Sequence, residues 1–496
     1  MIVVNHRLKL VLGFSLWATV SLAEEAWWSF QAPVQPGCPA LVESDHPIDH
    51  FVKERLAREG LWISQQADRA TLIRRLHLVM LGVPPTPGDV QAFVGNPASL
   101  DELWPALVDR VLSDSRYGER WAQHWLDVIR WAETVGFETN APRPHAWHYR
   151  DWVIRALNKD LPYDDFVFAQ LAGDQLGDDA ALGFLVAGPA NLPGQVGRDE
   201  EAMRQARQDE LDEVVRTVSQ AFLGLTVGCA RCHDHKFDPI TAKDYYSMQA
   251  VFAGLYYGNR RLRGEADDRM QSQVPSTAKQ LDRLENALEA KRQKLGLRPT
   301  LTSPQIESFA PVLAKSIRMR INSTNNGQAA SLYEFEAWTS GDSSSNVALA
   351  SAGALATASS FALENQTRHP DCLNDGSVDQ RQAFPWRAAS GGEAWLQIDL
   401  AAPAMVDRVV WHQGFSLPAD YVIEVQPAST AVWQEVAHPR DRLPHESDVR
   451  TNIAPLLGLN QGQTTDLMTQ IARVRQTRAR LSQLRAGPPV YAASFS

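Results

Sequence analysis

Residues 317–321 read Ile-Arg-Met-Arg-Ile, a regular alternation of apolar and polar side chains. Because successive side chains of a strand point to opposite faces, this pattern predicts a β-strand with one buried face. The alternation recurs at residues 395–400 (Trp-Leu-Gln-Ile-Asp-Leu) and at residues 406–411. Turns rich in Ser, Gly and Asn separate these runs, so we expect residues 311–440 to form an all-β sandwich domain.

The segments on either side of this domain have helical periodicity. Apolar residues follow heptad-like spacing at Leu281, Leu284, Leu288 and Leu295 within residues 268–298, and at Leu467, Ile471, Val474 and Leu481 within residues 460–486. Each segment alone would expose an apolar stripe, which predicts that the two pair as an antiparallel coiled-coil hairpin. The alternative is two unrelated helices on the surface of the main body.

The chain between residues 24 and 262 is expected to be mainly helical. Ile48, Phe51 and Leu56 begin a pattern of apolar residues three or four positions apart, and similar spacing continues to Leu262. The predicted fold class is therefore α+β and multidomain. It comprises an N-terminal helical domain, a helical hairpin, an inserted all-β sandwich, and a tail at residues 487–496.

Composition limits the class of protein. The chain has 496 residues, with 48 Lys and Arg against 58 Asp and Glu, and it is 44% hydrophobic and 21% charged. These values are typical of a globular protein and exclude a disordered chain, a collagen and a multi-span membrane protein. The acidic balance argues against nucleic acid as a partner, because phosphate binding requires clustered Lys and Arg. Fifteen tryptophans favour large cores, sugar-stacking surfaces, or both.

Residues 1–23 have the pattern of a secretory signal peptide. Arg7 and Lys9 precede an apolar run at residues 10–20, and Ser21-Leu22-Ala23 places small residues at the cleavage positions. This run is too short to span a bilayer comfortably, and no other stretch approaches twenty apolar residues. We therefore expect a periplasmic or secreted protein with no transmembrane span. The alternative is a hydrophobic N-terminal helix of the fold.

The one sharp chemical signal is Cys229-Ala230-Arg231-Cys232-His233. Cys-x-x-Cys-His is the attachment pattern of c-type haem, in which two thiols bind the porphyrin and the next imidazole is the axial iron ligand. The predicted cofactor is therefore covalent haem c on Cys229 and Cys232, with His233 on the iron. Export favours this interpretation, because haem is attached covalently on the far side of the membrane.

Three other interpretations of this motif remain open. Cys229 and Cys232 can form an ordinary or redox-active disulfide. They can bind zinc together with His233 and His235, although four ligands within seven residues are cramped for a tetrahedron. They can also be reduced, buried thiols. The other two cysteines, Cys38 and Cys372, lie far away in sequence.

No distal iron ligand can be assigned from the sequence. The available side chains are His124, His145, His148, Met203 and Met248. A Met or His in the sixth position would favour electron transfer, whereas an open position would permit small-molecule chemistry.

Several segments, in fixed order over residues 27–260, resemble the planctomycete-type secreted cytochrome family. They are Ile48-Asp49-His50-Phe51, Leu81-Gly82-Val83-Pro84-Pro85-Thr86-Pro87, Tyr117-Gly118-Glu119-Arg120-Trp121, His124-Trp125-Leu126-Asp127, Tyr149-Arg150-Asp151-Trp152-Val153, Leu171-Ala172-Gly173-Asp174 and residues 228–240 around the cysteines. Members of that family often carry carbohydrate-binding modules, which implies polymer breakdown outside the cytoplasm. The resemblance thus implies a polysaccharide or cell-surface glycan as a partner.

The β-domain resembles a discoidin-type (coagulation factor 5/8 C-terminal) domain at Asn374-Asp375-Gly376, at Trp386 and at residues 393–400. The resemblance implies a jelly-roll sandwich that binds glycans or lipid head groups through loops at one end, with calcium near the Asn-Asp-Gly turn. Asn374, Asp375 and Trp386 become candidate ligand-binding residues. Trp395 and Trp411 lie in strand patterns and are expected in the core.

Relatives usually continue past a segment like Pro488-Pro489-Val490-Tyr491-Ala492 into a further C-terminal domain. The resemblance therefore implies either a truncated product or a split one, in which a separate chain supplies that domain.

Polar side chains are dense between Trp121 and Asp151. Arg130, Arg143 or Arg150 would be suitable partners for haem propionates. Asp127 and Arg130, three positions apart, also predict an ion pair within one helix. Asp127 with Glu133 would suit a glycosidase acid–base pair.

Three functional hypotheses follow. The first is an exported c-type cytochrome-like protein, with a redox partner protein, that performs electron transfer or an oxidative step in polysaccharide use. The second is a glycan-binding scaffold whose cysteines form a disulfide or a small metal site. The third is a hydrolase that uses the carboxylates of the helical domain.

Overall fold

The computed structural model describes residues 27–39, 46–136, 140–190, 199–341, 343–362, 368–378, 384–450 and 455–495. It is 45% helical and 19% strand, so the mixed α+β class is confirmed. The chain divides into two compact units. Unit 1 comprises the residues up to Leu262 together with the segment from Pro489, and unit 2 comprises Arg263–Pro488. The expected signal peptide lies outside the described residues.

Unit 1 is built mainly from helices. They are α1 (Pro47–Arg58), α2 (Arg69–Leu81), α3 (Pro87–Val94), α4 (Leu100–Leu112), α5 (Arg116–Val128), α6 (Trp147–Asn158), α7 (Tyr163–Leu176), α8 (Glu200–Val218) and α9 (Ala242–Val251), with short turns η1 (Trp28–Phe30), η2 (Ala181–Val186), η4 (Ser219–Leu223) and η5 (Val227–Arg231). Side-chain caps fix several starts: Asp68 accepts from the Thr71 N–H at 2.8 Å, and Ser99 and Thr241 form capping boxes. The predicted helical character of this region is confirmed.

Two apolar clusters hold unit 1. The larger one joins α5 to α9 and η2, with Tyr149, Phe184 and Tyr245 fully buried at its centre. The smaller one packs α2, α3 and α4 around Ile73 and Leu107. Among the described residues, no helix is long and apolar enough to cross a membrane.

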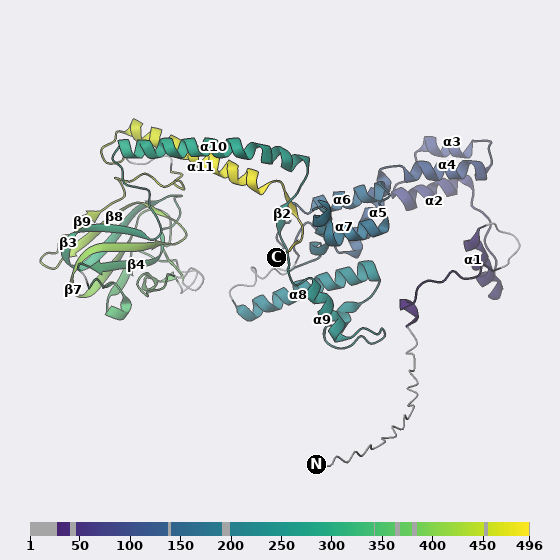
Figure 1. The fold of residues 1–496 in the computed structure, drawn as a ribbon, viewed down its shortest axis with the longest axis horizontal. Coiled ribbons are helices and arrows are strands. Elements are labelled where there is room, and N and C mark those ends of the chain that lie inside the picture. The colour runs from purple at the N-terminus through teal and green to yellow at the C-terminus, as the bar shows by residue number, and fades with distance from the viewer. Residues whose placement is uncertain are drawn as a thin grey trace, which may run out of the picture. The chain divides into compact units, whose positions relative to one another are not determined.

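The last residues of the chain return to unit 1. Strand β10 (Pro489–Tyr491) pairs antiparallel with β2 (Asn259–Arg261), and β11 (Ser494–Phe495) pairs with β1 (Leu255–Tyr256). Figure 1 accordingly shows the C-terminus beside β2. Val490 is fully buried in the same cluster as α5 to α9. The expectation of a separate tail is therefore wrong, because its apolar side chains complete the core of unit 1 and make unit 2 an insertion.

Unit 2 begins and ends with two long helices, α10 (Glu265–Lys294) and α11 (Gln461–Ala486). They lie side by side and antiparallel (Figure 1), with Lys291 paired to Asp466 near one end and the Gln271 amide donating to the Leu484 carbonyl at 2.6 Å near the other. Leu281, Val474 and Leu481 are buried between them. The pairing was predicted from the heptad spacing, and the alternative of unrelated helices is wrong.

The rest of unit 2 is one antiparallel sheet of seven strands. They are β3 (Gln305–Thr324), β4 (Ser331–Thr339), β5 (Leu355–Ala358), β6 (Trp386–Arg387), β7 (Ala394–Gln413), β8 (Pro418–Pro427) and β9 (Gln434–Ala437). Their order is β6-β4-β7-β3-β8-β9, with β5 also paired to β7. The long strands β3 and β7 pair from Gln305–Trp411 to Ile321–Ala394, with two register shifts.

The alternating pattern of residues 317–321 defines the two faces of β3. Ile317, Met319 and Ile321 are buried in the core, whereas Arg318 and Arg320 point to the other face. Both arginines pair with Glu424 on β8, at 2.7 and 3.1 Å. The predicted strands are therefore present, although residues 395–400 and 406–411 belong to one continuous strand, β7.

Candidate functional site at the Cys-x-x-Cys-His loop

The two-cysteine motif lies on a loop between α8 and α9. Helix α8 ends in a single π-turn, and Gly224, in the left-handed conformation (φ 64°), redirects the chain. Cys229 lies within the short helix η5, and Cys232 follows its last residue. Residues three apart eclipse in a 3₁₀ turn, so the two cysteines lie on one side of it.

Both thiols of the motif are accessible. Cys229 and Cys232 are exposed, and neither forms a disulfide in the structure. The interpretation as buried, inert thiols is therefore wrong for this pair, and the disulfide of the second interpretation is not formed in the structure.

The imidazole of His233 is exposed to solvent and is held through one ring nitrogen. Its Nδ1 donates to the carbonyl oxygen of Asp234 at 2.8 Å, and the side chain is exposed. This bond fixes the tautomer with the proton on Nδ1 and leaves the lone pair on Nε2. A backbone carbonyl on Nδ1 is the usual arrangement for an imidazole that binds a metal through Nε2.

His235, in contrast, is part of the frame of the loop. Its Nδ1 accepts from the Asp238 N–H at 2.9 Å, and its Nε2 lies 2.9 Å from the hydroxyl of Thr226. Since both nitrogens are occupied, the four-ligand zinc set with His235 is not assembled. Over the described ranges, no group of three or more His, Cys, Asp or Glu side chains is arranged to hold a metal ion.

The buried carboxylate of Asp212 binds side chains that hold the loop in place. Asp212 on α8 is only 7% exposed. It accepts from Arg216 Nε at 2.6 Å and from the Tyr245 hydroxyl on α9 at 2.7 Å, and it pairs with Arg231 at 3.3 Å. Burial, together with the neighbouring Asp212 carboxylate, raises the pKa of Tyr245 above its usual range, so its hydroxyl remains a donor.

Sequence reasoning missed Asp212 and Tyr245. The available signal was the carboxylate of Asp212, which with Glu213 lies between the apolar positions Leu211 and Val214 of α8, because a charge on a buried helix face requires partners.

The donor set of the loop fits a covalently attached haem. Two exposed thiols lie on one side of a turn, and an imidazole with a free Nε2 follows directly. Leu223 and Phe237, on the chain just before and after the motif, are large apolar side chains left exposed, a surface suited to cover by a macrocycle.

The candidate distal ligands mostly have other roles. His148 stacks on Trp147 with ring centroids 3.7 Å apart, and burial lowers its pKa. His124 packs edge-on against Trp121, and Met248 packs on the main core. None of these contacts identifies a sixth ligand.

The three arginines considered as propionate partners are already engaged. Arg143 is buried, donates to the carbonyls of Ala187 and Gly188 at 3.0 and 2.9 Å, and lies over the ring of Tyr491. The remaining pairs are Arg150 with Asp151 and Glu133, and Arg130 with Glu213 at 2.8 Å. These arginines hold unit 1 together.

The predicted ion pair of Asp127 with Arg130 is wrong. Arg130 follows α5 in a left-handed conformation (φ 57°), which turns its side chain to Glu213 on α8. Burial raises the pKa of Glu213, against the effect of the Arg130 charge. Glu133 pairs with Arg150 at 3.4 Å on the surface, and the acid–base pair of Asp127 with Glu133 stays a prediction.

An aromatic pocket lies beside His124 in unit 1. It has a volume of about 310 Å³ and is lined by residues of α5, α6 and α7 together with Leu161. Trp121 and Tyr163 are exposed at this pocket. Trp125 is held in place, because its indole N–H donates to Tyr149 and Gln170. The pocket is thus rigid and apolar, with His124 as a polar lining residue.

In unit 2, the candidate ligand contacts Trp386 and Asn374 are structural. Trp386 is fully buried and donates its indole N–H to the Ser360 carbonyl at 3.1 Å. Asn374 is buried, and its amide donates to the carbonyls of Ala348 and Ala354. As ligand contacts both predictions are wrong, because each side chain holds the core or a turn.

The two other tryptophans of the strand patterns differ from each other. Trp411 is buried, as expected, whereas Trp395 is 37% exposed on the outer face of β7. The prediction of Trp395 as a core residue is therefore wrong.

The turn after Asn374 brings two carboxylates together. Glu334 on β4 is only 1% exposed, and the Gly376 N–H lies 3.2 Å from both of its carboxylate oxygens. Burial and the charge of Asp375 raise the pKa of Glu334 to about 8. Carboxylate oxygens are the donors that calcium prefers, and a cation would relieve the repulsion, so this pair fits part of a calcium site.

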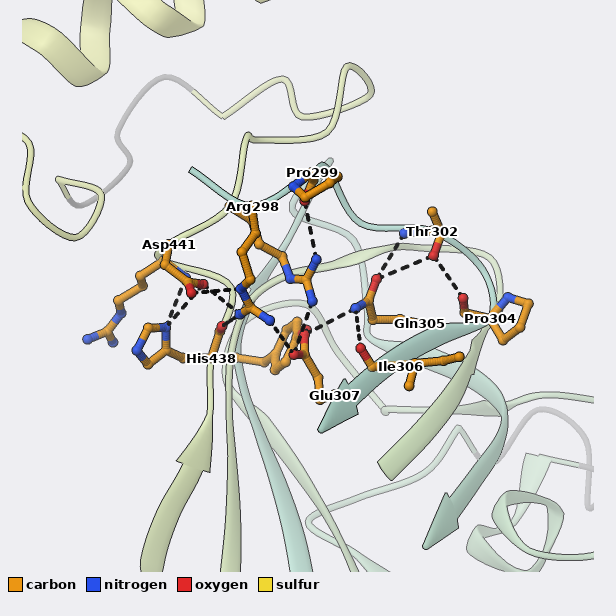
Figure 2. Close-up of polar contacts among 12 residues, drawn as sticks. Arg298, Pro299, Thr302, Pro304, Gln305, Ile306, Glu307, His438 and Asp441 are labelled. Carbon is orange, nitrogen blue, oxygen red and sulfur yellow. Dashed lines mark hydrogen bonds and ion pairs between the residues drawn. The ribbon is translucent and has the colours of Figure 1, made fainter. Parts of the chain in front are cut away.

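The largest polar network of unit 2 lies where the chain enters and leaves the sheet (Figure 2). Glu307 is fully buried and accepts from Arg298, Arg442 and Tyr421 at 3.0, 3.1 and 2.6 Å. Arg298 also forms a double hydrogen bond with Asp441 at 2.6 and 2.7 Å. The network joins the segment before β3 to the segment after β9 and closes the domain with charge-assisted hydrogen bonds.

Sequence reasoning missed this network, because Asp441, Arg442 and Tyr421 lie more than a hundred positions from their partners Arg298 and Glu307. A polar pocket of about 560 Å³ lies beside it, lined in part by Arg298, Glu435 and His438.

The helical unit thus exposes two thiols and an imidazole on its Cys-x-x-Cys-His loop. A family model described as PSCyt2, a protein of unknown function (DUF1549), matches residues 47–257. The match includes the loop, Asp212 and Tyr245, and this part of the chain is similar to a cytochrome-like domain. Comparisons with curated proteins and with solved structures gave no match.

Proposed function

We propose that this chain is an exported c-type cytochrome-like protein, with haem bound covalently by Cys229 and Cys232 and its iron bound by His233. The observation that carries the proposal is the pair of exposed thiols, one in η5 and one directly after it, followed by an imidazole whose Nδ1 is fixed by the Asp234 carbonyl. When bound, haem would supply electron transfer or an oxidative step. The chain's own part is to anchor the group and to orient the imidazole.

The test is expression of the full chain, with its N-terminal residues, together with a haem-maturation system. The expected product is coloured, keeps its haem after denaturation, and gains the mass of one porphyrin. The double variant Cys229→Ser, Cys232→Ser loses all three properties, and Cys372→Ser, a cysteine outside the motif, retains them. A matured sample with no iron and no added mass would contradict the proposal.

The same expression tests localisation. We propose that residues 1–23 direct export to the periplasm or beyond, because a charged start, an apolar run and small residues occur in that order. Fractionation should find the protein outside the cytoplasm, starting near Glu24. Cytoplasmic protein with an intact N-terminus would contradict this.

For unit 2 we propose a discoidin-like jelly-roll that binds a polysaccharide or cell-surface glycan, with calcium at Glu334 and Asp375. The seven-stranded antiparallel sheet and the close carboxylates at the Asn-Asp-Gly turn support it.

Calcium should raise the midpoint of thermal unfolding of unit 2 in the wild type and not in Glu334→Gln. Binding of polysaccharides to the full chain should depend on calcium. Absence of binding to any neutral or acidic polysaccharide would remove the glycan role.

If the matured protein is colourless, the free, exposed thiols favour the second hypothesis, a glycan-binding scaffold with a redox-active or metal-binding thiol pair. Zinc content and the thiol–disulfide equilibrium distinguish its two forms.

A further inference from the structure

The residue just before each cysteine of the motif is tied to the same buried carboxylate. Arg231, which precedes Cys232, pairs directly with Asp212 at 3.3 Å. Gly228, which precedes Cys229, is tied through one arginine: Arg216 Nη2 donates to the Gly228 carbonyl at 3.2 Å, and Arg216 Nε donates to Asp212 at 2.6 Å. Asp212 thus anchors the start and the end of η5.

The contacts at the start of η5 allow little movement. A Cβ on Gly228 would lie 2.6 Å from Cγ of Arg216, so the Arg216 side chain lies directly against the main chain before Cys229. Asp212 itself is fixed from α9, because the Tyr245 hydroxyl donates to it and the Gln249 amide lies 3.3 Å from that hydroxyl.

The electrostatics explain why the anchor is strong. Asp212 is buried, and its charge is compensated by short hydrogen bonds from Arg216 and Tyr245 and by the ion pair with Arg231. Asp209, one turn earlier on α8, also pairs with Arg231 at 2.8 Å, but its side chain is half exposed. An exposed pair of this kind contributes little. The chain therefore provides a matched control for Asp212.

We propose that Asp212 is a positioning residue for the thiol pair. Through Arg231 and Arg216 it holds η5 so that the sulfurs of Cys229 and Cys232 stay on one side of the turn at a fixed separation. The inference deepens the proposed haem attachment, and it concerns the geometry of the thiols before any group is bound.

The test measures the thiol pair in the haem-free full chain. Reaction with glutathione disulfide joins the two sulfurs and releases two molecules of reduced glutathione, with both cysteine protons passing to the products. The equilibrium constant reports the effective concentration of one thiol toward the other. Cys38→Ser and Cys372→Ser in the background leave only this pair.

Asp212→Asn is expected to lower this effective concentration at least about tenfold, because η5 loses its charged anchor. Asp209→Asn is expected to change it less than about twofold. Arg231→Gln should add little in the Asp212→Asn background, because both residues act through one contact. The denaturant midpoint of unit 1 shows whether each variant is folded.

A folded Asp212→Asn protein whose effective concentration lies within twofold of the wild type overturns the inference. If Asp212→Asn does not fold, Tyr245→Phe is used instead, because it removes one hydrogen bond to Asp212 and keeps the aromatic ring. A smaller decrease in the effective concentration of the thiols is then expected. No change in Tyr245→Phe would then overturn it.

Haem loading distinguishes this inference from the proposed function. If the wild type binds haem, Asp212→Asn should load a smaller fraction under equal maturation. If the wild type never binds haem, the proposed function fails, while the thiol equilibrium still decides the role of Asp212.

Discussion

Gly118 on α5 lies directly against the main chain of Ile154 on α6. A Cβ at position 118 would stand 2.5 Å from the Ile154 carbonyl oxygen and 2.6 Å from the side chain of Asn158. Asn158 in turn accepts from the Gly118 N–H at 2.8 Å. The approach of the two helices therefore requires glycine here, since a backbone oxygen cannot move aside as a flexible side chain can.

Gly118→Ala should destabilise unit 1 by about 1–3 kcal/mol, the range for overpacking a close contact. Calorimetry of the full chain should show a lower midpoint for one transition. Gly88→Ala on α3 is the control: a Cβ there meets only the Thr86 hydroxyl at 3.8 Å, so it should be neutral or slightly stabilising. Equal unfolding midpoints for Gly118→Ala and the wild type would contradict this, because they would mean that α5 and α6 can move apart to admit the methyl group with no loss of stability.

The stability of unit 2 should fall as pH rises through the neutral range. The pKa of Glu334 is about 8 in the folded protein against an ordinary value of 4.5, so between these values the folded state keeps a proton that the unfolded chain has lost. The contribution of Glu334 is fully present below about pH 4.5 and is lost as pH rises to about 8. The free energy of unfolding should fall by at most about 1.4 kcal/mol per pH unit in this range.

Urea unfolding at pH 5.5, 6.5 and 7.5 tests this, with Glu334→Gln expected to have a flatter dependence than the wild type. Glu336→Gln is the control. The pKa of Glu336 is lowered against the effect of burial by hydrogen bonds from His412 and Trp338, so its loss should reduce stability. Because its charge is only a lesser cause of the raised pKa of Glu334, Glu336→Gln should flatten the pH dependence less than Glu334→Gln does. Parallel curves for Glu334→Gln and the wild type would mean that the carboxylate is ionised throughout.

Val490→Ala should destabilise unit 1, although Val490 lies beyond the whole of unit 2 in sequence. Val490 is fully buried in the main core of unit 1, and removal of two methyl groups there should reduce the free energy of unfolding by about 2 kcal/mol. Hydrogen exchange of α5 to α9 should quicken while exchange in β3 and β7 stays unchanged. Phe495→Ala, on exposed β11, is the control and should have a small effect. Faster exchange confined to β3 and β7 would contradict this assignment.

Trp386 and Trp395, two tryptophans of unit 2, should behave in opposite ways when each is replaced by alanine. Trp386→Ala removes a fully buried ring and should destabilise unit 2 by about 3–5 kcal/mol, whereas Trp395→Ala on the outer face should change stability by less than about 1 kcal/mol. Fluorescence-monitored denaturant unfolding measures both. A larger loss for Trp395→Ala would reverse the assignment of core and surface.

Several elements could be predicted from local sequence alone. The alternation at residues 317–321 predicted a strand, and the heptad spacing of Leu281 and Leu481 predicted paired helices, because these patterns repeat with the geometry of the element itself. Both predictions agree with the structure. The chemical motif Cys229 to His233 was also visible, since its spacing lies within one turn.

The failures share a cause. Trp395 and Trp411 both lie in strand patterns, yet Trp411 is buried and Trp395 is exposed, because the neighbours of the sheet cover only Trp411. Arg130 pairs with Glu213 and not with Asp127, because a left-handed residue after α5 changes the direction of its side chain.

The sequence by itself determined which segments are helical, which are extended, and where two thiols and an imidazole occur together. Only the tertiary structure decided that Asp212 anchors that motif, that Glu307 closes unit 2, and that Tyr491 packs under Arg143 in unit 1. The physical reason is that periodicity is a property of neighbouring residues, whereas burial and ion pairing depend on which distant segments meet.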